Sequence, residues 1–275
     1  CVHPAGGNVI CYAALARELG AAQPFYGLQA RGLDGRDEPF TRLEEMADYY
    51  VEAVRGVRPE GPYLLGGWSL GGAVAFEMAR RLGERGQEVA LLALLDSPAP
   101  HASQRGVEVD EAELLAGLGE DLGLHVSAED LRGLTTDERL ALFLEHGRAR
   151  ALVPSDYDLA QARRLLHVYE TNIRAFGNYR PQPAATRIIL HRAGEAAGAD
   201  SHGAPHPSAA DPTLGWGALS TAPVEVRRVP GDHVSMLSEP HVKALAAELG
   251  RLLEEASAAT AGAARTAFDI KTQGA

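Results

Sequence analysis

The stretch Pro62-Tyr63-Leu64-Leu65-Gly66-Gly67-Trp68-Ser69-Leu70-Gly71-Gly72-Ala73 decides the fold. The apolar run 62–65 predicts a strand that enters the glycines, and residues 73–82 predict a helix that leaves them. A serine on such a sharp turn brings strand and helix so close that the positions two before and two after it cannot easily carry a Cβ. Glycine stands at both positions, 67 and 71. The pattern predicts a nucleophile elbow that presents the Ser69 hydroxyl above the end of a sheet.

Composition sets the broad class of the protein. The chain has 275 residues, 45% of them hydrophobic, which is enough for a large core, and its net charge of -11 argues against a nucleic-acid partner. No apolar run approaches the ~20 residues of a membrane span, and no signal peptide is recognisable, so a cytoplasmic protein without membrane association is predicted. Cys1 and Cys11 are expected to be reduced core thiols, with a disulfide as the alternative. Because the chain has no initiator Met and opens in a strand-like Cys1-Val2, we expect a domain cut from something longer.

Strands alternate with helices along most of the chain. Strands are expected at 1–2, 25–30, 89–95, 186–191 and 224–229, and helices at 10–19, 43–54 and 239–253 besides the elbow helix. Thr41 with Glu44, and Thr135 with Glu138, have the spacing of helix capping boxes. The alternation predicts an α/β fold in which helices flank a mostly parallel central sheet.

A helical stretch interrupts this alternation. Little in residues 103–179 is typical of a strand, and apolar side chains recur at helical spacing in its last part, at Leu159, Ala162, Leu165, Leu166, Tyr169, Ile173 and Phe176. The stretch follows the strand that ends at Asp96, at the sheet end where open α/β folds bind ligands, so a lid is predicted. The expected organisation is a first core part (1–102), a helical lid insertion (103–179), a second core part (180–256) and a flexible C-terminal tail (257–275).

An elbow serine needs a base, because its hydroxyl attacks at neutral pH only when an imidazole takes its proton. Among ten histidines, His233 follows the strand 224–229 in a loop before the closing helix. That is where α/β-hydrolases place the base, in the chain order serine, acid, histidine. His167, His191 and His241 fall on predicted helices or a strand, and His3 is expected to shape the loop after the first strand. We therefore expect His233 to be the base.

The imidazole in turn needs a carboxylate that holds its tautomer. Asp96 ends the strand after the elbow helix and is the favoured acid, because a buried strand fixes it at the sheet end that carries the serine. Glu195, Asp200 and Asp211 follow the next core strand, the other place where hydrolases carry their acid, and they remain alternatives, as does an Asp96 that only caps a helix. Asp232 is expected to be solvated or to bond within its loop.

The loop after the first strand, His3-Pro4-Ala5-Gly6-Gly7-Asn8, is expected to supply an oxyanion donor. Pro4 has no N–H, so the amide of Ala5 is the first donor past it, with Gly6 as the fallback, and Leu70 supplies the second amide. Metal-ligand side chains gather in one later loop that is rich in Pro and Gly, and no metal site is expected there. They are Asp200, His202, His206 and Asp211.

Four phrases together resemble the terminal thioesterase domains of nonribosomal peptide synthetases. They are His3-Pro4-Ala5-Gly6-Gly7, the elbow from Gly66 to Gly72 with Ala75-Phe76-Glu77-Met78-Ala79, Leu94-Leu95-Asp96-Ser97, and Gly231-Asp232-His233. The resemblance covers nearly the whole chain except the lid and tail, and it implies an α/β-hydrolase fold. It also implies that Ser69 is the acylated nucleophile, that Asp96 and His233 complete its triad, and that the amides of Ala5 and Leu70 form the oxyanion hole. Leu214-Gly215-Trp216 also looks like a family phrase, to which no chemistry is assigned.

The function implied by the resemblance is release of a peptidyl chain, as in antibiotic biosynthesis. The chain would arrive as a thioester on the phosphopantetheine arm of an upstream peptidyl carrier domain of the same synthetase, pass to Ser69, and leave to water or to a nucleophile of its own. Hydrolysis, macrocyclisation and oligomerisation use the same triad and remain open. No cofactor bound by the domain itself is implied, and the excised domain is expected to be monomeric.

Two other classes of function remain possible for the sequence. One is a stand-alone α/β-hydrolase, an esterase or editing thioesterase that acts on small acyl substrates. The other is an inactive hydrolase fold used as a binding module, against which a complete triad argues.

Overall fold

A parallel four-stranded sheet lies at the centre of the protein. The structure is a computed structural model that describes residues 1–100, 110–195 and 210–273, with side chains up to residue 259. The strands are β1 (Tyr63–Trp68), β2 (Val89–Leu95), β3 (Ile188–Ala193) and β4 (Val224–Val229), which lie in that order across the sheet. The predicted fold class, an α/β-hydrolase fold with a mostly parallel sheet flanked by helices, is confirmed.

The sheet edge beside β1 differs from the sequence prediction. Val2 forms isolated parallel bridges to Leu28 and to Gly67, so the expected strands at 1–2 and 25–30 each contribute a single bridging residue. The expected strand at 186–191 lies two residues later in the chain, whereas β2 and β4 have the predicted bounds. Val2 thus continues the sheet past β1 and brings the loop that follows it to the end of the elbow strand.

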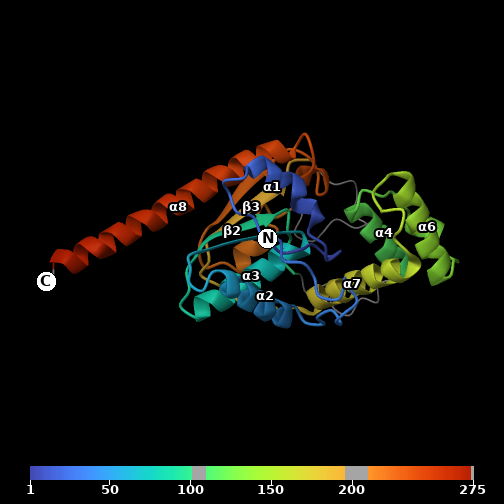
Figure 1. Ribbon diagram of the computed structural model, residues 1–275, viewed down its shortest axis with the longest axis horizontal. Coiled ribbons are helices and arrows are strands. Elements are labelled where there is room, and N and C mark those ends of the chain that lie inside the picture. The colour runs from blue at the N-terminus through green and yellow to red at the C-terminus, as the bar shows by residue number, and fades with distance from the viewer. Residues whose placement is uncertain (101–109, 196–209, 274–275) are drawn as a thin grey trace.

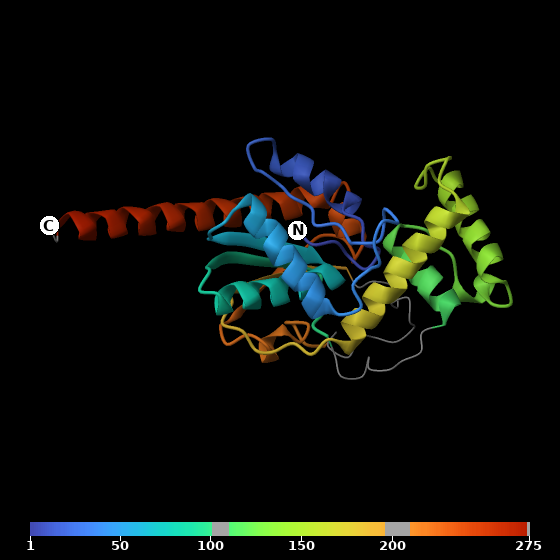
Figure 2. The ribbon, with the colours of Figure 1, turned by 60° about the horizontal axis from the view of Figure 1, so that its bottom comes forward.

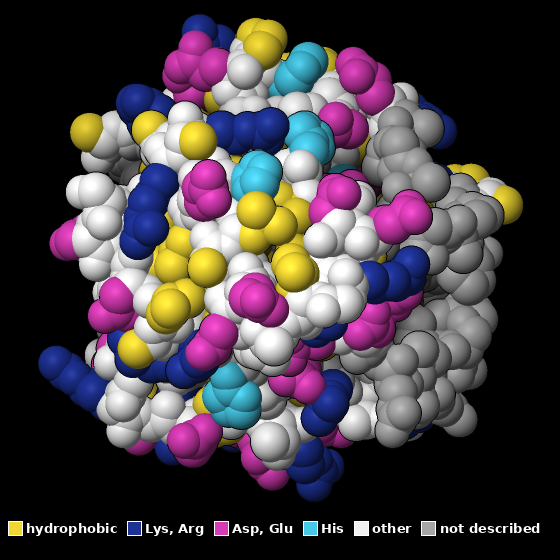
Figure 3. Space-filling model, turned by 90° about the vertical axis from the view of Figure 1, so that its right-hand side faces the viewer, with side chains coloured by type: hydrophobic (Ala, Val, Ile, Leu, Met, Phe, Trp, Pro, Cys, Tyr) yellow, Lys and Arg dark blue, Asp and Glu magenta, His cyan; other side chains and the backbone are white. Residues whose placement is uncertain are grey.

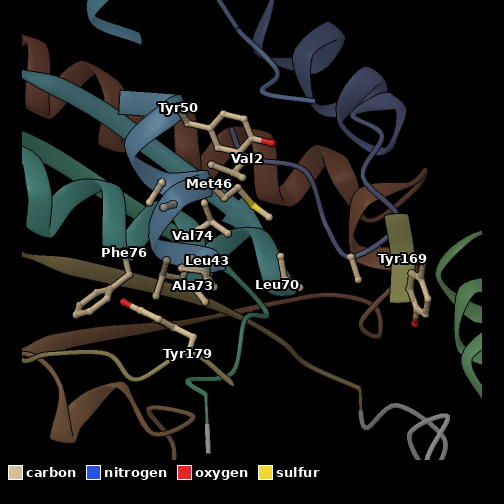
Figure 4. Packing of buried hydrophobic residues seen from close by; sticks show 14 of the residues in the cluster. Val2, Leu43, Met46, Tyr50, Leu70, Ala73, Val74, Phe76, Tyr169 and Tyr179 are labelled. Atoms are coloured by element: carbon tan, nitrogen blue, oxygen red, sulfur yellow. The ribbon is translucent and has the colours of Figure 1, made fainter. Parts of the chain in front are cut away.

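Helices cover both faces of the sheet, with α1 and α8 on one face and α2 and α3 on the other (Figure 1). These elements are α1 (Ala13–Leu19), which follows the 3-10 turn η1 (Ile10–Tyr12), α2 (Leu43–Val57), α3 (Leu70–Glu84) and α8 (Val242–Gln273). Strand β2 is apolar throughout because it is covered on both sides: Leu91 packs toward α1 and α8, and Leu92 toward α2 and α3. On the latter face Val2, Met46 and Val74 pack together (Figure 4).

A group of helices lies between β2 and β3 in the chain and extends from one end of the sheet (Figure 2). It consists of α4 (Glu111–Asp121), α5 (Ala128–Leu131), α6 (Thr136–Ala149) and α7 (Leu159–Asn178). These helices correspond to the predicted lid, whose boundaries at 103 and 179 stay a prediction. Its last helix is fastened to the core, because the hydroxyl of Tyr179 donates to Glu77 Oε2 on α3 over 2.7 Å.

Two local predictions about helix ends have different outcomes. The capping box of Thr135 and Glu138 is present at the start of α6. At α2 the N-cap residue is Arg42, and no side chain caps the helix, so the predicted box of Thr41 and Glu44 is wrong.

The C-terminal segment also differs from the sequence prediction. Helix α8 begins three residues later than expected, and it continues through the predicted flexible tail to Gln273. The sequence lacks apolar periodicity there, but alanine, which is frequent in this stretch, has the highest helix propensity. Each helix in the described part of the chain is too short or too polar to cross a membrane.

The 3-10 turns η3 (Trp216–Ala218) and η4 (Ser235–Leu237) flank β4. The first precedes this strand, and the second follows it just before α8.

Candidate active site

Ser69 occupies the sharp turn between β1 and α3 that the sequence predicts. Its φ of 55° and ψ of -129° put it in a backbone region that a residue with a side chain rarely adopts. A Cβ added at Gly67 would lie 2.2 Å from the Gly71 carbonyl carbon, and one added at Gly71 would lie 2.4 Å from the Val2 oxygen. Both positions therefore require glycine, because neighbouring backbone atoms leave no room for a Cβ.

Two backbone amides near Ser69 are available as donors. Leu70 is the first residue of α3, so its N–H has no partner inside the helix. Ala5 lies in a turn that is closed by a hydrogen bond from the Gly7 N–H to the Pro4 oxygen, 2.9 Å long. Among the residues that the structure describes, neither the Leu70 N–H nor the Ala5 N–H has an acceptor. The chain thus offers the two amides that the sequence predicted for an oxyanion hole.

The oxyanion loop, defined here as residues 3–7, is held from two sides. His3 Nδ1 donates to the Pro4 oxygen over 2.7 Å, and its Nε2 accepts from the Tyr50 hydroxyl over 2.8 Å. Burial lowers the pKa of His3 to about 4, so this ring is neutral and carries its proton on Nδ1. From the lid, Asn172 Nδ2 donates to the Ala5 oxygen over 2.8 Å. His3 therefore shapes the loop, as predicted, and the lid helix α7 shares that task.

Asp96 and His233 form a hydrogen-bonded pair at the same end of the sheet. Asp96 follows β2, and its Oδ2 lies 2.8 Å from His233 Nδ1, while its Oδ1 accepts from the Ala193 N–H over 2.9 Å. A carboxylate only accepts hydrogen bonds, so Nδ1 carries the proton of the neutral imidazole and Nε2 is left as an acceptor. That is the tautomer a general base requires.

The charges of this pair reinforce each other. Burial opposes ionisation of Asp96, but the hydrogen bond and charge of His233 outweigh it, and the pKa of Asp96 is lowered. Burial also opposes protonation of His233. The hydrogen bond and charge of Asp96, with the charges of Asp121 and Glu120, outweigh that effect and raise the pKa of His233 above its ordinary 6.5.

Trp68 connects the elbow to the histidine loop. Its indole N–H donates to the His233 oxygen over 2.9 Å, and the two rings lie 5.0 Å apart between centroids. Its backbone N–H donates to the Tyr12 hydroxyl, which in turn donates to the Val2 oxygen. Within the described residues, Ser69 Oγ makes no hydrogen bond to His233. Catalytic hydrogen bonds are often long before a substrate binds, so this geometry is compatible with a triad.

Trp216 and Leu214 hold the segment that follows Asp96, so the phrase Leu214-Gly215-Trp216 has a structural role. The Trp216 indole N–H donates to the Ser97 oxygen over 2.7 Å, and the Ala99 N–H donates to the Leu214 oxygen over 2.9 Å. The segment that follows Asp96 is thereby fixed. A buried tryptophan needs an acceptor for its N–H, and this was the signal in the sequence that pointed to such a contact.

The other acid candidates have different surroundings. Asp211 accepts hydrogen bonds from the Thr213 N–H (2.9 Å) and the Gly215 N–H (3.0 Å), so its carboxylate serves its own turn. Glu195 is exposed after β3, and Asp200 lies outside the described residues. Asp232 bonds within its own loop, where it accepts from the amides of residues 234 and 235.

The remaining histidines and the candidate metal ligands lie in other surroundings. His191 is fully buried in β3, where burial lowers its pKa to about 4, and His167 is exposed on α7 beside Glu38. His241 lies immediately before α8. The described residues contain no group of three or more His, Cys, Asp or Glu side chains that could hold a metal ion, while His202 and His206 fall outside them. Cys1 and Cys11 are free thiols, each only partly buried.

Sequence reasoning did not identify Asn172 as a functional residue. It lies three positions after Tyr169, inside the apolar stripe of α7, and is almost fully buried. A polar side chain in such a stripe needs a buried partner, and that was the available signal.

Comparison with known proteins gives consistent results. Residues 1–253 match the family model described as "Thioesterase domain". The chain is 35% identical, over 192 residues, to a dimodular nonribosomal peptide synthase of Bacillus subtilis (strain 168), a match that covers 70% of this chain and 8% of that protein. A crystal structure of a four-domain nonribosomal peptide synthetase bound to AMP and glycine matches with a TM-score of 0.80 and 30% identity, over 91% of this chain and 19% of that one. The NocB thioesterase domain, in covalent complex with a fluorophosphonate nocardicin G analogue, matches with a TM-score of 0.63 and 29% identity, over 92% of both chains. The chain thus spans a small part of the synthetases that it resembles and nearly all of a single thioesterase domain.

Proposed function

The chain belongs to the thioesterase domain family, as a terminal thioesterase domain of the nonribosomal peptide synthetase type, and from this membership we propose that it releases a peptidyl chain through an acyl-enzyme on Ser69. The single observation that carries the proposal is the hydrogen bond between Asp96 and His233, at the sheet end that also bears the elbow serine. This bond leaves His233 Nε2 free to accept a proton.

In the first step Ser69 Oγ attacks the thioester carbonyl, and its proton passes to His233 Nε2. The carbonyl oxygen becomes an oxyanion, which the amides of Ala5 and Leu70 stabilise. Collapse of this intermediate breaks the carbon–sulfur bond. The departing thiolate takes the proton from His233, and the acyl chain remains as an ester on Ser69.

In the second step His233 removes a proton from water, or from an amine or hydroxyl of the acyl chain itself. The activated nucleophile attacks the ester carbonyl, and Ser69 leaves with the proton that His233 returns. Water gives the free acid, and an internal nucleophile gives a macrocycle. Attack by the nucleophile of a second chain gives an oligomer.

The proposed partner is the peptidyl carrier domain that precedes the thioesterase in the same synthetase. Its phosphopantetheine arm delivers the chain, and the domain itself needs no bound cofactor. Support comes from the relatives, which are multidomain synthetases of which this chain matches only a small part.

The acyl-enzyme is tested with Ser69→Ala, in which only the nucleophilic oxygen is lost. The wild-type protein treated with a fluorophosphonate probe should gain one covalent group by intact mass, and the variant should gain none while its circular dichroism stays unchanged. A variant that is still labelled at the wild-type rate would place the nucleophile elsewhere.

The carrier-bound substrate is tested separately. The same peptide is offered as a thioester on a carrier domain and as a simple soluble ester, and the carrier thioester should be released much faster. Preference for the soluble ester would support a stand-alone hydrolase instead. A mass spectrum of the product distinguishes hydrolysis, macrocyclisation and oligomerisation.

A further inference from the structure

The oxyanion loop contains a tight turn, Pro4-Ala5-Gly6-Gly7, which is closed by the hydrogen bond from the Gly7 N–H to the Pro4 oxygen. Neither Ala5 nor Gly6 has a positive φ, so among the common hydrogen-bonded turns only type I fits. In a type I turn ψ of the first central residue is about -30°, which places the N–H groups of the two central residues on the same side of the chain. Within the described residues the Gly6 N–H, like that of Ala5, has no acceptor. The turn therefore presents two adjacent amides.

The peptide between Ala5 and Gly6 can turn over while the ends of the turn stay in place. The result is a type II turn, in which ψ of Ala5 would be about 120° and φ of Gly6 about 80°. Glycine adopts such a φ at little cost. The observed conformation does not itself require glycine, because a Cβ added at Gly6 would meet only Leu118 Cδ1 at 3.6 Å and Asn8 Nδ2 at 3.9 Å. In the type II state the Ala5 oxygen would lie beside the Ala5 N–H, where it would repel an oxyanion.

Asn172 on α7 bonds to a group that this rotation would move. Its Nδ2 donates to the Ala5 oxygen over 2.8 Å, and the residue is only 1% exposed. Val168, one helical turn earlier, also approaches the loop, because a Cβ added at Gly7 would lie 2.8 Å from Val168 Cγ1. One face of α7 thus lies along the turn, and the hydrogen bond keeps the Ala5 oxygen on the side of that helix.

The second polar atom of Asn172 indicates that this amide does more than fill space. Acidic and basic side chains are interspersed over the surface at the lid end of the molecule, where water solvates them (Figure 3). Asn172 Oδ1 is instead buried, and no hydrogen bond to it is found in the described part of the chain. A buried acceptor without a partner costs free energy that a leucine of similar size would not cost. The advantage of asparagine at this position is therefore its Nδ2 donor.

Helix α7 is also held by contacts outside the turn. The hydroxyl of Tyr179 donates to Glu77 over 2.7 Å, and His167 Nε2 lies 3.3 Å from a carboxylate oxygen of Glu38. Asn172 lies between these two contacts in the chain. The donor is thus carried by a helix whose position does not depend on the turn alone.

We propose that Asn172 is a positioning residue for the oxyanion hole. Its hydrogen bond holds the Ala5–Gly6 peptide in the type I orientation, so that the Gly6 N–H joins those of Ala5 and Leu70 as a donor and the Ala5 oxygen stays away from the oxyanion. Asn172 acts through the loop and not by contact with the reacting atoms. This inference rests on the proposed function, because an oxyanion forms only when Ser69 attacks a carbonyl group.

The test is Asn172→Leu, which removes the donor and keeps a side chain of similar size. With a peptidyl N-acetylcysteamine thioester, kcat should fall at least about tenfold, toward the loss of about 10²–10³-fold that follows removal of an oxyanion donor. KM should change little. Asn172→Ala serves as a second variant if leucine prevents folding. Asn178→Leu, the same change at an exposed position of the same helix, is the control and should leave kcat unchanged.

Two further readouts distinguish a lost peptide orientation from a general loss of structure. Infrared difference spectra of an isotope-labelled acyl group that leaves Ser69 slowly report the stretching frequency of the ester carbonyl. Hydrogen bonds lower this frequency, so Asn172→Leu should raise it. Gly6→Ala adds a Cβ that disfavours the positive φ of a type II turn. The loss of kcat caused by Asn172→Leu should therefore be at least about fivefold smaller in a protein that also carries Gly6→Ala.

The outcomes separate this inference from the function on which it rests. If no thioester acylates the wild-type protein, the proposed function fails. If the wild-type protein is acylated but Asn172→Leu keeps the same kcat and the same carbonyl frequency, the inference is refuted while the function stands. A loss of kcat that Gly6→Ala does not reduce, with an unchanged carbonyl frequency, would show that Asn172 acts on something other than this peptide, and this too would overturn the proposal.

Discussion

Asp96→Asn should inactivate the domain through the tautomer of His233, and the surroundings of Asp96 explain why. In the native protein Oδ1 accepts from the Ala193 N–H and Oδ2 accepts from His233 Nδ1–H. An asparagine has one oxygen and one NH₂ group, and the oxygen must face the Ala193 N–H because two donors cannot bond to each other. The NH₂ group is then forced toward His233.

This orientation reverses the hydrogen bond to the imidazole. Nδ1 must accept from the new NH₂ group, so the ring proton moves to Nε2, where it blocks removal of the serine proton. The corresponding substitution in serine proteases lowers kcat by about 10⁴-fold, or roughly 5.5 kcal/mol in the barrier. We expect a loss of that order here. Substrate binding should change little, because the new side chain has the same shape.

The assay is hydrolysis of a peptidyl N-acetylcysteamine thioester, with nitrogen NMR of the imidazole as a direct readout of the tautomer. In the wild-type protein kcat/KM should fall as pH drops, with a midpoint above 6.5, because Asp96 raises the pKa of His233. In Asp96→Asn the midpoint should move down, since the neutral amide no longer stabilises the charged ring. Asp211→Asn is the matched control, because the hydrogen bonds that the structure describes for that carboxylate lie within its own turn. Near-wild-type activity of Asp96→Asn, with a collapse at Asp211 or Glu195, would refute the reasoning.

The remaining predictions concern the elbow, the histidine loop and the lid. Gly67→Ala places a Cβ 2.2 Å from backbone carbon and should lower the free energy of unfolding by about 3 kcal/mol or more, measured by urea denaturation. Gly83→Ala, where a Cβ meets nothing within 4 Å, should instead raise it by about 0.5–1 kcal/mol, and equal effects of the two substitutions would contradict the elbow geometry. Trp68→Phe leaves the part-buried His233 oxygen without the indole donor, so it should cost about 1 kcal/mol of stability and lower kcat more than it changes KM. Unchanged kcat would mean that this bond does not position the histidine. Amide hydrogen exchange should be faster in α4 and α6 than in β2, and should slow when a non-hydrolysable acyl group is attached at Ser69. Exchange as slow as that of β2, and unaffected by acylation, would make the lid a static layer.

The parts of the fold that the sequence predicted are those in which local pattern and burial agree. Strand β2 is an unbroken apolar run because helices cover both its faces, so its bounds could be predicted from the sequence alone. The elbow could also be predicted from the sequence, because its sharp turn excludes a Cβ at positions 67 and 71 and glycine stands at both.

What the sequence could not provide are contacts between distant segments. Trp216 donates to a carbonyl 119 positions earlier in the chain, and Asn172 donates to one 167 positions earlier. A buried donor in the sequence signals that a partner exists, but only the folded chain identifies that partner. The first strand was overpredicted because Val2 pairs through single bridges, and the extent of pairing depends on neighbours that its own residues do not specify.

The hydrogen bond from Asn172 to Ala5 has a consequence for domain engineering. A chimera that exchanges the entire insertion between related domains removes a support of the oxyanion loop along with the segment meant to alter substrate choice. Cutting before α7 keeps Asn172 with its own loop, and it also keeps Tyr179 with Glu77. Helices α5 and α6 are then the natural unit of exchange, because Leu118 on α4 also lies beside the loop, at Gly6. Variation among related synthetases should accordingly be freer in those helices than along the face of α7 that touches the loop.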